Sequence, residues 1–416
     1  MNKSFIKGLV AILMLMLVDV TANAQYYMNV IKTDGTTIDL PVDEIDNVSF
    51  SYHTPELKVA TMEAVRLPDL NIARGDQVVF VSNGQLVVAG GHVEDFDVTY
   101  TAEYFDNREW HTINMNYSHD MAFSVVFSDG RMMIGGGCPD GWGIGQSSAV
   151  EMYYPENHSF AAIPSMTSER ALTRAVELAD GNVFVSGNWY NYDSRELYSA
   201  SANEFSSIGS VSEARSLPYI LRSDENNAII FGPMGNYGGS TSLIVDRYEG
   251  DPFEVELLET WTPFALPVNW RAADCAIGDY SYLIAAKRYD ENYNQEIGLI
   301  KVVGETFSLL DLELPIPTEY EGVTLNYSGI VFTDKDKKVA YMPAWNGNIN
   351  APVYFILKID YSASKGKLTL YKTGVLDAYA SITSMTMLPD GRLVAVGGVY
   401  DSNFHPYSTV WAFKPF

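Results

Sequence analysis

Seven polar residues recur along the chain and could together bind an anion. Successive members are 45 to 56 residues apart, and they are Arg74, His119, Arg170, Arg215, Arg271, Asn326 and Ser381. Four of them are arginines, although the chain has only 27 lysines and arginines in all. A guanidinium offers a bidentate fork to a carboxylate, so converging arginines suit an acidic sugar such as a sialic or uronic acid. The alternative is that each arginine pairs with an acid on its neighbour or binds loop carbonyls.

Aromatic residues form a second candidate set. They lie in seven segments that each follow a hydrophobic strand, and acids and amides accompany them. The members expected to bind a ligand are Trp142, Trp189, Tyr190, Tyr237, Trp345 and Tyr400, with Phe96 in the first segment. Aromatic faces stack on the apolar face of a sugar ring, while carboxylates and amides bind its hydroxyls. The set therefore favours a glycan-binding rim, and the alternative is that the rings pack loop against loop.

A repeated strand–turn–strand pattern must position both sets. Its clearest copies are residues 79–91, 123–137, 175–187 and 384–398, each ending in glycine, and the seven turns lie 44 to 58 residues apart. Two-residue hairpin turns at this period indicate the blades of a β-propeller. We therefore predict an all-β, seven-bladed propeller. The loops between second and third strands share one face with the connections between blades, so both candidate sets should meet at the channel mouth.

The repeats resemble those of the kelch family. In the first, Gly90-Gly91 is followed by Tyr104 and Trp110, which looks like the kelch tyrosine–tryptophan motif. Later aromatic residues in comparable places are Tyr153 or Tyr154, Phe160, Tyr198, Phe205 and Phe307. The resemblance to kelch-repeat, galactose-oxidase-like propellers covers residues 57–416 and implies the fold, but kelch propellers host unrelated functions. Repeats four and six are degenerate.

The N-terminal residues are expected to lie outside the propeller. A basic start, an apolar run over 9–18 and Ala22-Asn23-Ala24 indicate a signal peptide over 1–24. Residues 25–56, with a hairpin signal at Asp34-Gly35, resemble the short N-terminal β module of many secreted proteins of Bacteroides-type bacteria. We expect an exported protein, in the periplasm or at the cell surface.

The last repeat supplies only three of the four strands that a blade needs. These strands are expected at 384–388, 392–396 and 408–413. Residues 57–67 precede the first inner strand and have the place of a missing fourth strand. We predict that they pair with the C-terminal blade and close the ring, because an unpaired edge would otherwise remain.

Several functions are disfavoured. The net charge of −25 repels nucleic acid and anionic membranes. The apolar run over 9–18 is too short to favour membrane insertion. The six histidines show no i, i+4 pair and no common loop, so no metal site and no cofactor are predicted. A galactose-oxidase-like copper site would need two tyrosines, two histidines and a cysteine, which cannot be placed here.

Three functions stay open. The first is a module that binds a glycan through the loop face. The second is an enzyme similar to the kelch-type sialic acid mutarotases, acting as a mutarotase or epimerase on an acidic sugar, with Arg215 and Glu213, or Arg170 and Glu169, as candidate pairs. The third is an adhesive protein that binds a surface protein.

Overall fold

The computed structural model describes most of the chain. The described residues are 26–31, 35–47, 55–141, 144–188, 194–210, 218–232, 244–248, 255–257, 275–289, 295–399 and 405–415. The chain divides into two compact units, Met1–Thr54 and Pro55–Phe416. Across the described ranges, no helix has the length and apolarity needed to cross a membrane.

The first unit contains a β-hairpin. Its strands are β1 (Tyr27–Ile31) and β2 (Thr37–Pro41), which pair antiparallel from Tyr27↔Pro41 to Ile31↔Thr37 and lead into the 3-10 helix η1 (Val42–Glu44). Most residues of both strands are exposed. An isolated two-stranded hairpin is marginally stable in water, so this unit supplies little core of its own.

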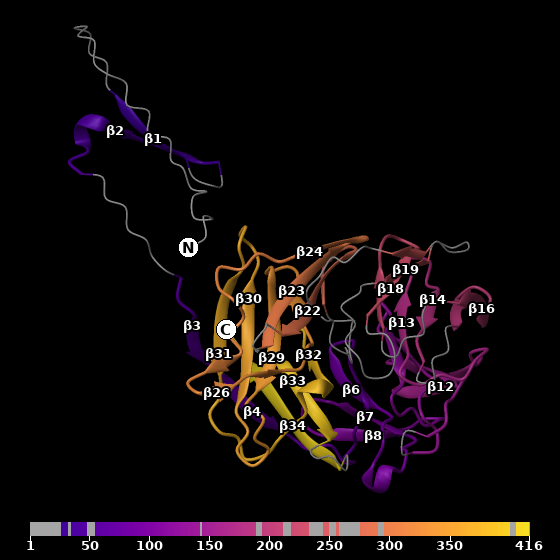
Figure 1. The fold of residues 1–416 in the computed structure, drawn as a ribbon. Coiled ribbons are helices and arrows are strands. Elements are labelled where there is room, and N and C mark those ends of the chain that lie inside the picture. The colour runs from indigo at the N-terminus through magenta and orange to yellow at the C-terminus, as the bar shows by residue number, and fades with distance from the viewer. Residues whose placement is uncertain are drawn as a thin grey trace. The chain divides into compact units, whose positions relative to one another are not determined.

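Six four-stranded antiparallel sheets form most of the second unit (Figure 1). The first contains β5 (Val78–Ser82), β6 (Gln85–Ala89), β7 (Thr101–Phe105) and β8 (Trp110–Asn114). The second contains β9 (Phe123–Val126), β10 (Met132–Gly135), β11 (Val150–Tyr154) and β12 (Ser159–Ile163). The third contains β13 (Arg174–Glu177), β14 (Val183–Ser186), β15 (Ser194–Ser199) and β16 (Glu204–Ser210).

Two of the remaining four-stranded sheets are also formed by four strands consecutive in sequence, and the third takes one strand from the start of the unit. The fourth contains β17 (Tyr219–Arg222), β18 (Ala228–Phe231), β19 (Ile244–Tyr248) and β20 (Val255–Leu257). The fifth contains β21 (Ala276–Gly278), β22 (Ser281–Tyr289), β23 (Gln295–Val303) and β24 (Thr306–Leu309). The last contains β32 (Met385–Met387), β33 (Leu393–Val399), β34 (Pro406–Lys414) and, from the start of the unit, β4 (Glu63–Leu67).

The sixth repeat departs from the four-stranded pattern. Its sheet contains β27 (Asn326–Tyr327), β28 (Phe332–Asp334), β29 (Val339–Trp345), β30 (Tyr354–Asp360), β31 (Lys367–Lys372) and β3 (Lys58–Thr61), and the hairpin β25 (Glu319–Tyr320) with β26 (Val323–Thr324) precedes it. The prediction of a seven-bladed propeller is therefore wrong: the structure has six four-stranded blades, and the sixth repeat forms an irregular six-stranded sheet in place of a seventh. Proline has no N–H to donate, and the inner strand is split into β27 and β28 beside Pro343.

Residues 57–67 take part in two sheets. β3 pairs parallel with β31, and β4 pairs antiparallel with β34, from Val410↔Leu67 to Lys414↔Glu63. The predicted pairing with the last sheet is therefore present for residues 63–67, whereas residues 58–61 pair with the sixth sheet instead. Because β4 precedes β5 in sequence, the last sheet is composed of strands from both ends of the unit.

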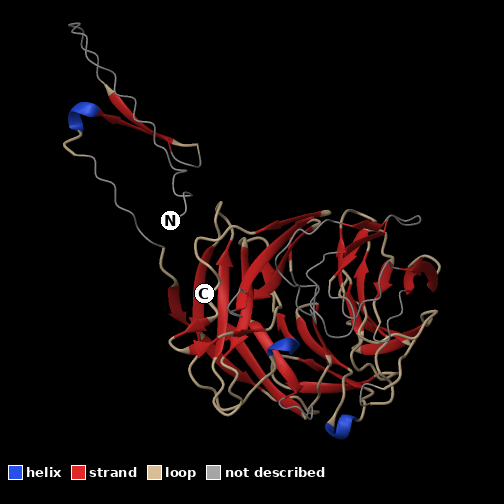
Figure 2. Ribbon diagram, viewed as in Figure 1, coloured by secondary structure: helices blue, strands red, loops and turns tan. Residues whose placement is uncertain are grey.

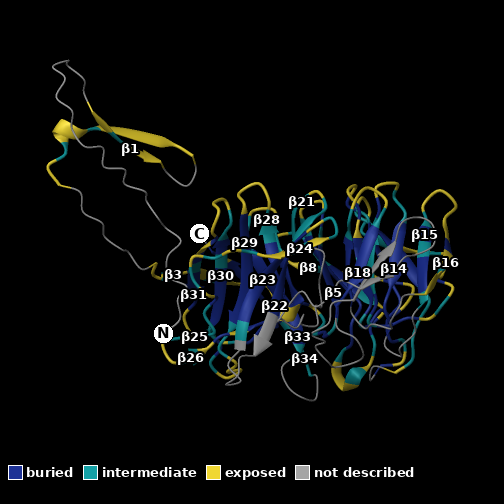
Figure 3. Ribbon diagram, turned by 45° about the horizontal axis from the view of Figure 1, so that its top comes forward, coloured by how far each residue is buried: buried dark blue, intermediate teal, exposed yellow. Residues whose placement is uncertain are grey.

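The strands are apolar on both faces because each sheet packs between neighbours. In β6, Val87, Val88 and Ala89 are fully buried, and Figure 3 shows buried strands between exposed turns. Strands dominate the second unit, whose described helices are the short 3-10 turns η2 (Glu94–Phe96) and η3 (Ile382–Ser384) (Figure 2). At the predicted turn between β5 and β6, Asn83 and Gly84 both have positive φ, as a type I′ hairpin requires.

The paired glycines allow close approach between sheets. Gly90 and Gly91 both have positive φ. A Cβ atom added at Gly90 would lie 2.4 Å from the carbonyl oxygen of His119, and one added at Gly91 would lie 2.3 Å from the carbonyl oxygen of Gly75. A Cβ atom added at Gly137 would likewise lie 2.4 Å from the carbonyl oxygen of Asp120. The glycine pairs at 90–91 and 136–137 thus bring the loops after β6 and β10 against neighbouring connections.

Candidate functional site

Arg74 forms a buried ion pair inside its own sheet. Its Nη2 lies 2.8 Å from Oε1 of Glu103 on β7, and both side chains are fully buried. Its Nη1 donates to the carbonyl oxygens of Gly90 and Thr101. Burial lowers the pKa of Arg74, while Glu103 acts in the opposite direction. Glu103 also accepts hydrogen bonds from the backbone N–H groups of Asn71 and Ile72, so one carboxylate anchors the whole connection into β5.

The next two repeats contain the same arrangement. Nε2 of His119 lies 3.4 Å from Oε1 of Glu151 on β11, and Nη2 of Arg170 lies 3.0 Å from Oε1 of Glu196 on β15. Each glutamate again accepts two backbone N–H groups from the entering connection. We name these three pairs the blade staples: Arg74–Glu103, His119–Glu151 and Arg170–Glu196.

The other members of the recurring polar set have varied positions. Asn326 donates to the carbonyl oxygen of Trp345, and Ser381 caps η3 by accepting from Thr383 N–H. Arg215 and Arg271 lie outside the described residues. The geometry of Arg74 and Arg170 supports the alternative in which each arginine pairs with an acid and binds loop carbonyls. The sequence signal that was overlooked is a glutamate in the third strand of each of the first three sheets, at Glu103, Glu151 and Glu196.

The staple at Glu151 predicts a pH dependence of stability. Burial alone would raise the pKa of Glu151, but hydrogen bonds from His119, Asn116 and Tyr117 outweigh it and hold the pKa below the ordinary 4.5. A lowered folded-state pKa stabilises the fold above the unfolded value, and this contribution disappears as the pH falls through the folded value. We expect Glu151→Gln to lower the urea midpoint at pH 7 and to differ much less from the parent protein near pH 3. An equal difference at both pH values would contradict this.

Part of the aromatic set lies in described residues. Trp345, at the end of β29, is half-buried and packs on Tyr379, with ring centroids 4.8 Å apart. Tyr379 in turn contacts Tyr407 of β34, with centroids 5.5 Å apart. The other expected ligand-binding aromatics, Trp142, Trp189, Tyr190, Tyr237 and Tyr400, lie outside the described residues.

A cavity of about 460 Å³ lies where the inner strands meet. It is lined by residues of β5, β9, β13, β17 and β32, together with Tyr282 of β22. Since these strands come from six sheets, the cavity marks the axis around which the sheets are arranged. Most of its lining side chains are apolar, and the charged ones are Arg174 and Glu177. A smaller hollow of about 50 Å³ is lined by Asp76, Leu172 and Thr383, among others.

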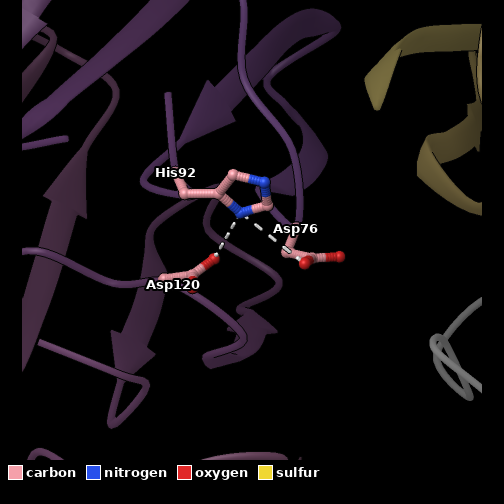
Figure 4. A group of neighbouring side chains, drawn as sticks. All are labelled: Asp76, His92 and Asp120. Carbon is pink, nitrogen blue, oxygen red and sulfur yellow. Dashed lines mark hydrogen bonds and ion pairs between the residues drawn. The ribbon is translucent and has the colours of Figure 1, made fainter. Parts of the chain in front are cut away.

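Asp76, which lines this hollow, also belongs to a cluster that the sequence did not indicate. Figure 4 shows the cluster, Asp76, His92 and Asp120. Nδ1 of His92 is 3.3 Å from Oδ1 of Asp120 and 3.6 Å from Oδ2 of Asp76. Asp76 and Asp120 come from the connections that lead into β5 and β9, and His92 follows Gly90-Gly91. Spacing within the sequence did not reveal the group, because its members are 16 and 28 residues apart. Phe96 stacks on the His92 ring, with centroids 5.2 Å apart.

Burial governs the electrostatics of this cluster. It raises the pKa of Asp76 to about 7, with a further contribution from Asp120 and an opposing one from His92. Burial also raises the pKa of Asp120, against the effect of His92. The adjacent Cys138 thiol has a pKa raised to about 12 by burial and by the two aspartates, so it is not a nucleophile at neutral pH.

Backbone contacts join the cluster to the aromatic residues. Arg74 forms a β-bridge with Tyr407, and Gly75 forms one with His92. The contacts between Trp345, Tyr379 and Tyr407 are therefore linked, through the backbone of residues 74 and 75, to His92 and the ring of Phe96 that stacks on it. We call this run of contacts, from Trp345 to Phe96, the aromatic rim.

Comparison with known proteins supports the fold. No protein-family model and no curated protein matches the sequence. One solved structure, titled a novel fungal alcohol oxidase with catalytic diversity among the AA5 family, in complex with copper, is similar with a TM-score of 0.53. The match has 11% sequence identity and covers 85% of this chain and 76% of the oxidase. At this identity the similarity establishes a galactose-oxidase-like β-propeller fold, and the copper is a property of that oxidase.

Proposed function

We propose that this protein binds a glycan through the loop side of its propeller, at the aromatic rim. The observation that carries the proposal is the continuity of half-buried aromatic side chains with buried carboxylates, from Trp345 through Tyr407 to Phe96 and the Asp76–His92–Asp120 cluster. The accessible faces of the half-buried rings of Trp345, Tyr407 and Phe96 suit the C–H face of a sugar, and the nearby polar groups suit its hydroxyls.

The blade staples affect which sugar is expected. Arg74 and Arg170 are buried and bonded to Glu103 and Glu196, so their guanidinium groups are occupied by internal carboxylates. We therefore expect recognition through hydroxyl and C–H groups more than through a sugar carboxylate. The proposed mutarotase pair of Arg170 with Glu169 has little support, because Arg170 is bonded to Glu196 and Glu169 is exposed.

A thermal-shift panel tests the proposal. The protein is heated with neutral sugars and oligosaccharides, uronic acids and sialic acid in turn. A ligand that binds only the folded state stabilises it by about 2.7 kcal/mol at a hundredfold excess over its dissociation constant. We expect a raised Tm with neutral glycans. A shift with acidic sugars alone would favour the mutarotase alternative, and no shift with any sugar would favour a surface protein as the partner.

Trp345→Ala locates the binding site on the molecule. Loss of one stacking face costs roughly 0.5–1.5 kcal/mol, so affinity for the glycan found in the panel should fall about two- to tenfold. Tyr280→Ala is the matched control, because Tyr280 lies in the turn between β21 and β22, at the opposite end of the strands from the loops that follow the second strands. Equal affinities in both variants would remove the aromatic rim from consideration.

We further infer that β4 closes the ring and that residues 1–24 direct export to the periplasm or the cell surface. Closure is supported by the pairing of β4 with β34 and by the hydrogen bond from Gly398 N–H to the Arg74 carbonyl oxygen. It is also supported by the Gln77 side chain, which donates to the carbonyl oxygen of Val396 at 2.7 Å. Export is supported by the basic and apolar pattern of the N-terminus.

A further inference from the structure

The backbone around the Asp76–His92–Asp120 cluster is held in place by hydrogen bonds. Gly75 and His92 exchange both backbone hydrogen bonds at 2.9 Å, and Cys138 N–H donates to the Asp120 carbonyl oxygen at 2.8 Å. Met121 N–H donates to the Asp76 carbonyl oxygen at 3.3 Å. Three side chains from separate segments are thus presented by fixed backbone, which is what a preorganised binding site needs.

The distances within the cluster suit ligands of a common ion better than hydrogen bonds. The separation of 3.6 Å between His92 Nδ1 and Asp76 Oδ2 is too long for a hydrogen bond, and 3.3 Å to Asp120 Oδ1 is long for one. All three ligand atoms lie within 4.8 Å of one another. Tetrahedral bonds of about 2.0–2.1 Å place neighbouring ligand atoms about 3.3–3.4 Å apart. Small side-chain rotations would therefore bring the three atoms onto one ion.

Both aspartates have an oxygen atom that lacks a hydrogen-bond partner within the described residues. These atoms are Oδ2 of Asp76 and Oδ2 of Asp120. The Asp120 side chain is only 1% exposed, and in the described ranges its ion pair is with His92, as is that of Asp76. A buried carboxylate oxygen without a partner is costly, and coordination of a cation would satisfy it.

We propose that Asp76, His92 and Asp120 form a binding site for a divalent transition-metal ion of the Zn²⁺ type. Two carboxylates neutralise the charge of the ion, and an imidazole nitrogen favours Zn²⁺ over the harder Mg²⁺ and Ca²⁺. The hollow of about 50 Å³ beside Asp76 has room for a water molecule as a further ligand. Three protein ligands with one open position make a site at which a ligand hydroxyl or water can bind the metal.

Gly75 positions the histidine in this site. A Cβ atom at residue 75 would lie 2.8 Å from both Cε1 and Nε2 of His92, so only glycine lets the ring occupy its place. Gly75→Ala should displace the imidazole and weaken metal binding without removing any ligand atom.

Calorimetric titration of the chelator-treated full chain with ZnCl₂ tests the proposal. We expect one tightly bound equivalent, and we expect Asp120→Asn and His92→Gln each to weaken it by about 100-fold or more, since even residues that only orient metal ligands contribute about 10–100-fold. Co²⁺ in place of Zn²⁺ should give visible absorption bands that both variants lose. The same titration with Mg²⁺ or Ca²⁺ should show much weaker binding.

The matched control is Asp106→Asn. Asp106 also pairs with a histidine, His111, at 3.0 Å, but on an exposed hairpin. This variant should retain the bound equivalent of Zn²⁺. Should Asp120→Asn fail to fold, Asp76→Asn decides the question, because that side chain is 19% exposed and tolerates replacement better. Absence of one-to-one Zn²⁺ binding, or equal binding in the cluster variants and the control, would overturn the proposal.

Discussion

Replacement of Arg170 by methionine is expected to lower the free energy of unfolding by about 3–5 kcal/mol, because it leaves the Glu196 carboxylate buried without its cation. Both side chains are fully buried and 3.0 Å apart. Glu196 would still accept hydrogen bonds from the backbone N–H groups of Thr167 and Ser168, so we expect the loss of stability to lie toward the lower end of this range. Urea unfolding followed by intrinsic fluorescence measures the change.

Two further variants make this measurement decisive. Arg131→Met removes an arginine from a pair of similar geometry, with Asp129 at 2.7 Å, but on the surface, where about 0–1 kcal/mol is expected. The double variant Arg170→Met with Glu196→Gln should recover part of the loss, because the buried negative charge is removed as well. If Arg170→Met were as stable as Arg131→Met but had lost glycan binding, the arginine would belong to the ligand site and not to a blade staple.

Removal of β4 is expected to abolish folding to a soluble monomer. A chain that begins at Pro68 leaves β34 with an unpaired edge along five residues, Val410 to Lys414, and buried residues of that strand would become exposed. The lost ladder hydrogen bonds contribute roughly 0.5–1.5 kcal/mol each, and total stabilities are only about 5–15 kcal/mol. Size-exclusion chromatography and circular dichroism of the purified protein would report the expected aggregation.

A series of start points separates β4 from the neighbouring segments. A chain beginning at Pro55 lacks only the first compact unit and should unfold at the same temperature as the full chain. A chain beginning at Met62 also lacks β3, which lies at the outer edge of the sixth sheet, and should be only mildly destabilised. A stable monomer beginning at Pro68 would contradict closure by β4.

The repeat pattern predicted much of the fold. Turns such as Asn83-Gly84 and the paired glycines depend on local backbone conformation, so they are visible in sequence. The split of the sixth inner strand was not predicted, although the sixth repeat was expected to be degenerate and has Met342-Pro343 where other repeats have glycines. The missing N–H of Pro343 shows where the hydrogen bonds between two strands are interrupted, but it does not show that the facing strand will divide into β27 and β28.

The site was less predictable than the fold. Recurring arginines suggested carboxylate binding, and Arg74 and Arg170 do bind carboxylates, but those of Glu103 and Glu196 in their own sheets. The residue type determines the preferred partner, while burial decides whether that partner is internal. The opposite happened with His92, which showed no metal-ligand spacing in sequence and yet lies between two aspartates.

By itself the sequence determined the all-β repeat and its turns, because hydrophobic period and turn chemistry are local properties. The count of three strands in the last repeat also predicted a partner within residues 57–67, and residues 63–67 of that segment pair there. Only the tertiary structure decided which polar residues meet. Asp76, His92 and Asp120 lie in connections before β5, after β6 and before β9. They come together because the glycine pair at 90 and 91 allows the backbone of neighbouring segments to approach within hydrogen-bonding distance. Such proximity arises from packing between sheets, and no spacing along one chain encodes it directly.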